Sequence, residues 1–106
     1  MAEKNPHKIR VRLQDGVIVV KMLLSHPMET GSRKHPSTGE PIPRHFIREI
    51  TCERNGSQIL QMDWGWGIST NPYLSFRVRD GKKGDVISAH WVDNLGETGS
   101  VEAKVT

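Results

Sequence analysis

The chain has one cysteine and five histidines, and these side chains have the most chemistry to offer. A catalytic cysteine needs a partner base and an electropositive, partly open site. Cys52 lies in an alternating segment at the same parity as Phe46 and Ile50, so the pattern predicts that it points into a core. We expect a free, buried thiol, with a redox role or a cross-link to another chain as the alternatives.

Three of the histidines lie in one stretch, between Ser25 and Phe46. His26 and His35 are nine residues apart, His35 and His45 are ten apart, and no His-x-His or His-x-x-His motif occurs. This spacing is not that of a metal site, so we expect polar loop residues and neither metal nor cofactor. A folded loop could still bring distant histidines together, and zinc is therefore the alternative.

No other motif indicates catalysis. The segment Gly65-Trp66-Gly67 lacks the third glycine of a dinucleotide-binding loop and does not open a helix. It is typical of a bend at the end of a strand. Since no Ser-His-Asp order or paired-carboxylate motif stands out, the residues predict a binding or interaction domain with no visible active site.

The stretch from Ser25 to Phe46 has no clear hydrophobic period and holds four of the six prolines. A loop of about 20 residues is uncommon in a small domain and is usually functional or disordered. This one mixes apolar Met28 and Ile42 with turn-forming residues rather than repeating Gly and Ser. We expect a structured surface loop, and the first place to look for a partner.

Elsewhere the chain alternates between apolar and polar residues in short segments, separated by turn signals such as Asp15-Gly16 and Asn55-Gly56. This predicts an all-β fold, an immunoglobulin-like β-sandwich of about seven antiparallel strands in a single domain, residues 1–106. A five-stranded OB-type barrel is the main alternative. The expected strands are residues 8–14, 17–24, 46–53, 57–64, 73–79, 86–93 and 98–106.

Two of these strands have a specific expected burial. Residues 17–24 are rich in apolar residues, so we expect burial on both faces over part of the strand. In residues 46–53, alternation places Phe46, Ile50 and Cys52 on one face and Ile47 on the other, with Glu49 and Thr51.

Charge and hydropathy set limits on partners. The net charge is +3, and the basic residues alternate with apolar ones, which is typical of solvated strand faces, so we expect no nucleic-acid binding. The sequence contains no run of about 18 apolar residues, so we expect no membrane insertion. The start, MAEKNPHKIR, lacks the apolar region of a secretory signal.

Three motifs give the chain a family resemblance: SHPMETG (Ser25–Gly31), Ile42-Pro43 with His45-Phe46-Ile47, and Asn71-Pro72-Tyr73. Together with TCERNG and HWVDNLGE, they resemble the SoxZ family from about residue 8 to residue 97. The resemblance implies an immunoglobulin-like sandwich that pairs as a heterodimer with a SoxY subunit of the Sox thiosulfate-oxidation system.

In that family the SoxY subunit carries pathway intermediates covalently on a C-terminal cysteine. The resemblance therefore implies a non-enzymatic scaffold that helps present the carrier to the pathway enzymes, through transient contacts. It also implies a periplasmic location without a signal peptide of its own, reached by export with SoxY. A homodimer in isolation would be compatible with this role, because an unpaired edge strand can bind a second copy.

The resemblance and the residue pattern together suggest a partner surface at the long loop and the neighbouring strand faces. The alternative function is a stand-alone thiol or sulfur-handling protein that uses Cys52. Aromatic residues and Met are frequent interface anchors. The candidate anchors are His26, Met28, Phe46, Trp66, Tyr73 and Trp91.

Overall fold

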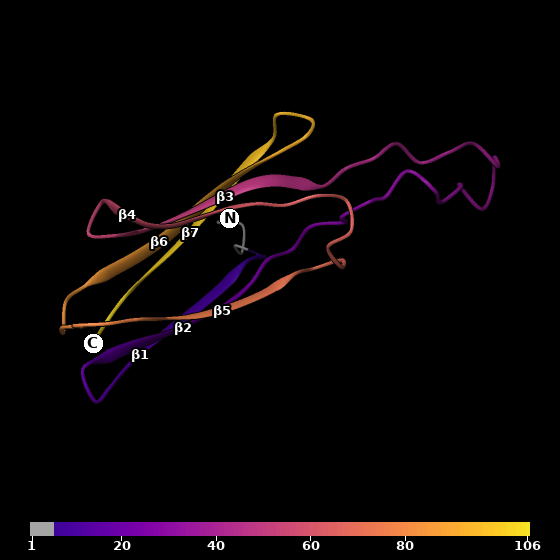
Figure 1. Ribbon diagram of the computed structural model, residues 1–106. Coiled ribbons are helices and arrows are strands. Elements are labelled where there is room, and N and C mark those ends of the chain that lie inside the picture. Colours follow the sequence, from indigo (N-terminus) through magenta and orange to yellow (C-terminus); the bar gives the residue numbers. More distant parts are fainter. Residues whose placement is uncertain (1–5) are drawn as a thin grey trace, which may run out of the picture.

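A computed structural model, which describes residues 6–106, places seven antiparallel strands in two layers (Figure 1). The start of the chain, on which the expectation about a signal peptide partly depends, lies outside these residues. The strands are β1 (Lys8–Gln14), β2 (Val17–Leu23), β3 (Ile47–Arg54), β4 (Ser57–Asp63), β5 (Tyr73–Val78), β6 (Val86–Asp93) and β7 (Thr98–Lys104).

The strands form two separate sheets, which confirms the predicted β-sandwich. The first sheet has the order β1-β2-β5, and the second has the order β4-β3-β6-β7. No strand pairing joins the two sheets among the described residues, so the barrel alternative is wrong. In constant-type immunoglobulin domains the fourth strand pairs with the first sheet. Here β4 pairs with β3 instead, because the tight Asn55-Gly56 turn makes the two a hairpin.

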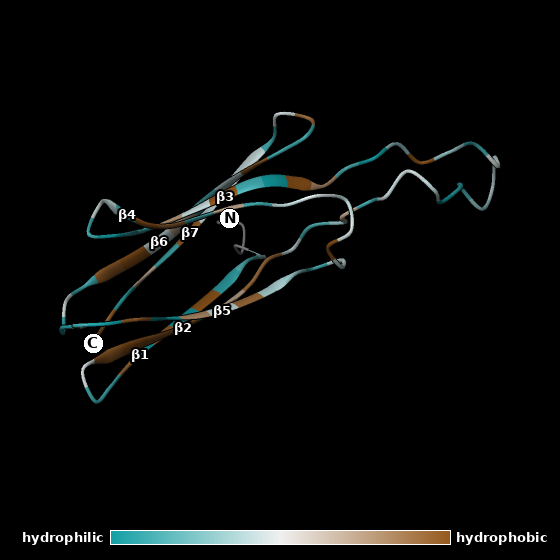
Figure 2. Ribbon diagram, viewed as in Figure 1, coloured by the Kyte–Doolittle hydropathy of each residue, from teal (hydrophilic) through white to brown (hydrophobic). Residues whose placement is uncertain are grey.

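The core lies between the sheets, where apolar side chains of alternating strand positions meet. Figure 2 shows hydrophobic positions, coloured brown, along strands of both sheets. Trp91 of β6 packs directly over Gly99 of β7, and a Cβ atom at Gly99 would lie 2.5 Å from the indole ring. The glycine therefore provides the space that the largest core side chain occupies. The buried apolar residues are Ile18, Val20, Met22, Leu24, Met28, Ile47, Ile50, Cys52, Ile87, Ala89, Trp91, Val101 and Val105.

Two burial predictions are wrong. Only one face of β2 is fully buried, with Ile18, Val20 and Met22, because no layer covers the outer face of the first sheet. Ile47 is fully buried together with Ile50, although strict alternation places the two on opposite faces. The pairing of β3 with β6 shifts register between Ile47 and Glu49, and this bulge returns Ile47 to the core side.

The predicted surface loop is a two-stranded arm, residues 29–45, that extends away from the sandwich (Figure 1). Isolated bridges pair Glu29 with His45 at its base and Lys34 with Pro41 further out. A hydrogen bond from the Gly39 amide to the His35 carbonyl closes the turn at its tip. The arm is therefore a structured element with its own backbone pairing.

In the part of the chain that the structure describes, no helix has the length and apolar character needed to cross a membrane.

Candidate functional site: a histidine–aspartate cluster at the base of the arm

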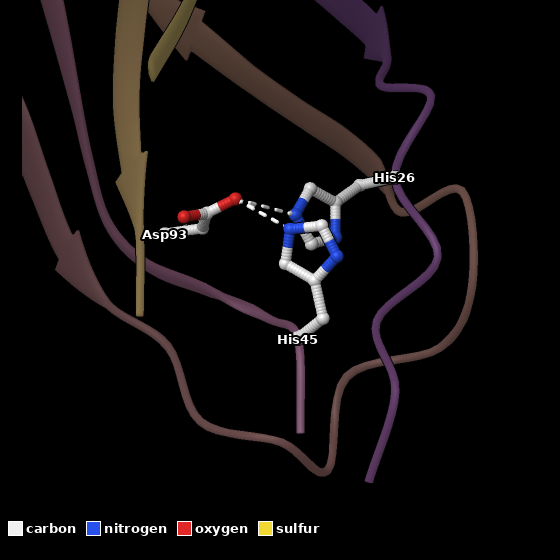
Figure 3. A group of neighbouring side chains, drawn as sticks. All are labelled: His26, His45 and Asp93. Carbon is white, nitrogen blue, oxygen red and sulfur yellow. Dashed lines mark hydrogen bonds and ion pairs between the residues drawn. The ribbon is translucent and has the colours of Figure 1, made fainter. Parts of the chain in front are cut away.

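Three polar side chains from distant parts of the chain meet at the base of the arm (Figure 3). His26 follows β2, His45 precedes β3, and Asp93 ends β6. The Oδ2 atom of Asp93 lies 3.3 Å from Nε2 of His26 and 2.7 Å from Nε2 of His45. Both histidines thus share one carboxylate oxygen, and their rings contact each other edge to face at 4.5 Å. We call these three residues the His–Asp cluster.

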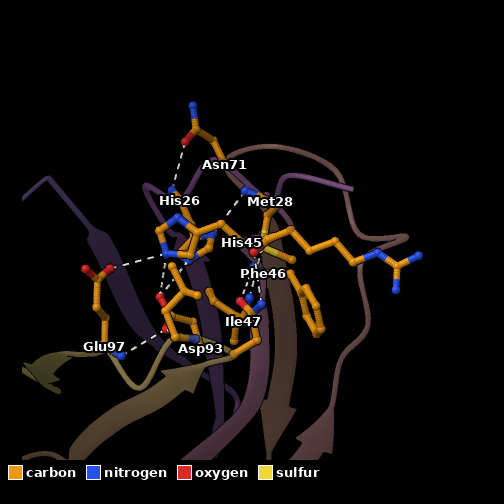
Figure 4. A network of polar contacts seen from close by, with 11 residues as sticks. His26, Met28, His45, Phe46, Ile47, Asn71, Asp93 and Glu97 are labelled. Atoms are coloured by element: carbon orange, nitrogen blue, oxygen red, sulfur yellow. Dashed lines mark hydrogen bonds and ion pairs between the residues drawn. The ribbon is translucent and has the colours of Figure 1, made fainter. Parts of the chain in front are cut away.

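Two asparagines hold the segments that carry the histidines, and Figure 4 shows one of them, Asn71, beside His26. Asn71 accepts a hydrogen bond from the His26 amide through its side chain and donates its own amide to the His26 carbonyl. Asn94 binds Phe46 in the same reciprocal way, beside His45. Each asparagine therefore replaces strand pairing at a point where the chain leaves a sheet.

Asp93 also shapes the turn between β6 and β7. Its Oδ1 atom accepts hydrogen bonds from the amides of Leu95 and Glu97, both at 2.9 Å. The carboxylate therefore receives two backbone donors on one oxygen and two imidazoles on the other, while its side chain is 2% exposed. A buried carboxylate requires this degree of hydrogen bonding.

The cluster has the residue types of a metal site, with ligand atoms within 4.8 Å of one another. Its hydrogen bonds argue against that use. The Met28 amide donates to Nδ1 of His26 at 3.0 Å, so the lone pair of Nδ1 is occupied. The proton of a neutral imidazole is then on Nε2, the atom that a metal would need. With Nε2 donating to Asp93, the three residues form a hydrogen-bonded cluster in place of a metal centre.

Burial sets the charge state of His26. It lowers the pKa of His26, because a buried imidazolium loses its hydration, and the neighbouring His45 lowers it further. Attraction from Asp93 and Glu97 opposes this but is smaller in total. Hydrogen bonds from both histidines and the turn amides lower the pKa of Asp93 against the opposing effect of burial, so the carboxylate is ionised at neutral pH.

The free energy of unfolding should therefore fall as the pH drops below about 6.5, and His26→Gln should reduce this dependence. The folded-state pKa of His26 is below the unfolded value, so the unfolded chain binds the proton first. The stability that neutral His26 contributes is fully present above its pKa in the unfolded chain. It is lost as the pH falls through its lower pKa in the folded chain. Urea unfolding between about pH 5 and pH 7.5 measures the slope. Equal slopes for the two proteins would contradict this assignment.

The candidate anchors fall into two groups. His26, Met28 and Trp91 are buried within the chain, so they present little surface to a partner. Phe46 is half-buried at the end of the arm. Trp66 and Tyr73 are exposed, at 49% and 61%. These two therefore have the surface area that an interface anchor requires, and the partner surface stays a prediction.

Sequence reasoning did not identify Asp93, Asn71 or Asn94 as part of any site. Asn71 lies in the Asn71-Pro72-Tyr73 motif, and Asp93 and Asn94 lie in HWVDNLGE, but their hydrogen-bond partners are 45 to 67 residues away, so neither motif indicates the contact. One signal was present: His26 and His45 flank the long loop. When a loop returns as a paired arm, residues at its two ends come together, as the Glu29–His45 bridge shows.

Cys52 lies in the middle of β3 with no exposed surface. Burial raises the pKa of its thiol to about 11, because the thiolate would lose its hydration in the core. No positively charged group offsets this effect. A thiol that is both inaccessible and un-ionised has neither property of a reactive cysteine.

The two sheets, the arm and the cluster that anchors it define a small β-sandwich protein. The family model described as Sulphur oxidation protein SoxZ matches residues 8–104. The chain therefore belongs to the SoxZ family, and its role is in sulfur oxidation. A search of curated proteins found no match.

Proposed function

We propose that the chain is the non-catalytic subunit of a sulfur-carrier complex in thiosulfate oxidation. It pairs with a SoxY-like subunit, whose C-terminal cysteine carries the covalent intermediate, and helps to present that cysteine to the pathway enzymes. The family match over residues 8–104 is the observation that carries this proposal. The complex works in the periplasm, and the chain reaches it by export together with its partner.

The burial of Cys52 supports the proposal that the partner subunit, and not this chain, carries the sulfur. A carrier sulfur must move between enzymes, whereas Cys52 is fixed within a central strand and fully buried. The chain has no second cysteine. The carrying thiol must therefore come from the partner, which also disfavours the alternative of a stand-alone thiol protein.

Exposed aromatic side chains near the arm support a partner surface there. The guanidinium of Arg44, in the arm, lies 5.3 Å from the centre of the Trp66 ring, which holds that ring against the arm. Tyr73 pairs across the strands with Leu23, and both side chains are exposed. Stable interfaces have an apolar, aromatic-rich centre, and these residues would supply it.

Co-expression with the SoxY-like protein of the same source tests the proposal. Size-exclusion chromatography with mass detection should show one stable 1:1 complex. Alanine at Trp66 or at Tyr73 should weaken the complex by about 30-fold in Kd, as expected for an anchor that contributes about 2 kcal/mol.

Ile59→Ala provides the matched control, since Ile59 is also an exposed apolar residue but lies on β4. This variant should bind the partner as the unmodified chain does. Two separate peaks for the unmodified proteins would contradict the carrier-subunit role. Undiminished pairing in both aromatic variants would remove Trp66 and Tyr73 from the interface.

A further inference from the structure

The outer face of the first sheet carries six basic side chains and no acidic one. These residues alternate with the core positions of β1, β2 and β5 and are all exposed. They account for six of the fifteen basic residues of a chain whose net charge is only +3. We call them the basic face: Lys8, Arg10, Arg12, Lys21, Arg77 and Arg79.

Strand register brings these charges together. Arg10 lies directly opposite Lys21, and Arg12 and Arg77 both flank Val19 from the two neighbouring strands. Paired residues of adjacent strands point to the same side of a sheet. A shallow groove of about 570 Å³ continues the face between Gln14 and Arg79. The nearest acidic residue in that groove is Asp15, in the turn at one end.

The basic face has no internal counter-charge. Within residues 6–106 none of its six side chains forms an ion pair, and Arg12 only donates a hydrogen bond to Gln14. Like charges directly opposite each other destabilise a sheet. An anionic partner would offset that repulsion. The cluster of like charges does not itself stabilise the fold.

The opposite side of the molecule has the reverse charge. At the paired outward positions of the second sheet, Glu49 faces Asp63, and Glu53 and Glu102 flank Ser88. Lys104, at the end of β7, and His90, which lies 3.4 Å from Glu53, also occupy these positions, and exposed Arg48 lies in the bulge of β3. The small net charge therefore conceals a separation of charge between the two outer faces. Such a separation orients the chain in the electric field of a charged partner.

We propose that the basic face is a transient docking surface for an acidic protein surface on the enzymes that act on the carrier complex; this rests on the proposed function. Permanent interfaces are depleted of charged residues at their centre, so the charged part of this face does not suit the stable subunit contact; Leu23 and Tyr73, which we place in that contact, border it beside Lys8. Long, mobile, unpaired charges suit fast encounters instead, because they raise association rates and release easily.

Charge reversal tests this proposal in the complex with the SoxY-like partner. Arg12→Glu with Arg77→Glu should lower the rate of reconstituted thiosulfate oxidation about tenfold or more at low salt and limiting carrier. The unmodified complex should slow as ionic strength rises, while the double variant should lose most of that dependence. Arg48→Glu with Lys83→Glu is the matched control, since it makes the same net charge change at exposed positions outside both the basic face and the arm.

The outcomes separate the two proposals. If the unmodified chains form no 1:1 complex, the proposed function fails, and the docking proposal fails with it. If the complex forms but the double variant oxidises thiosulfate as fast as the control, only the docking surface is wrong. Lys21→Glu is a second variant that folds readily, because it places a carboxylate opposite Arg10. It should give a smaller loss in the same direction.

Two other partners would overturn the docking surface. A fluorescent DNA oligonucleotide of about 20 nucleotides should not bind the complex at physiological salt; binding that Arg12→Glu abolishes would make the face a nucleic-acid site. Association of complexes at low salt, lost in the same variant, would indicate contact between the basic face of one copy and the acidic face of the next.

Discussion

Replacing Asp93 by Asn should lower the free energy of unfolding by about 3 kcal/mol, although the two side chains have nearly the same shape. Four donors converge on the carboxylate: the imidazoles of His26 and His45 and the amides of Leu95 and Glu97. An asparagine can accept on one side only. Whichever way its amide is oriented, its NH₂ group faces two of those donors.

His26 cannot adapt to this change. Its Nδ1 atom already accepts the Met28 amide, so its Nε2 atom must donate. The loss should appear in urea unfolding as a lower midpoint with an unchanged m-value, and in heating as a Tm lower by roughly 10 °C or more.

Glu97→Gln is the matched control for this prediction. Glu97 contacts the same histidine, His45, at 3.2 Å, but its side chain is 70% exposed. Its removal should change the free energy of unfolding by no more than about 0.5 kcal/mol. If Asp93→Asn were as mild as this control, the cluster would not anchor the arm and would need another role.

Cys52 should react with iodoacetamide at least about a thousandfold more slowly in the folded chain than in the unfolded chain. Two effects contribute. The thiol has no exposed surface, so alkylation requires the sandwich to open. With a pKa of about 11, only about one thiol in a thousand would be ionised at a pH near 8, even if reagent reached it.

Mass spectrometry of the alkylated chain, with and without guanidinium chloride, measures both rates. The unfolded chain should take up one equivalent within the time in which the folded chain takes up almost none, and Cys52→Ser should take up none in either state. Rapid labelling of the native protein would revive the alternative of a thiol protein and would place Cys52 at an accessible site.

The two faces of the sandwich show why net charge is a poor guide to partners. Along the sequence, basic residues alternate with apolar ones and suggested ordinary solvated strands. In the first sheet, three strands turn six basic residues to the same side, and four acidic residues lie on the outer face of the other sheet. A net charge of +3 therefore conceals two outer faces of opposite charge.

The sequence by itself determined the strands and the sandwich. Alternation is a local property, because a half-buried strand needs an apolar residue at every second position whatever its neighbours are. The turn at Asn55-Gly56 is equally local, since few other residues tolerate the positive φ that it requires. The family motifs around Ser25–Gly31 also lie within the sequence, and the family match agrees with them.

Only the tertiary structure decided which residues meet. Asp93 is 67 residues from His26 and 48 from His45, and their contact depends on how the arm closes and how β6 pairs with β3. The bulge that buries Ile47 and the register that gathers the basic face likewise depend on neighbouring strands. Such contacts are set by packing between distant segments, which no local pattern encodes.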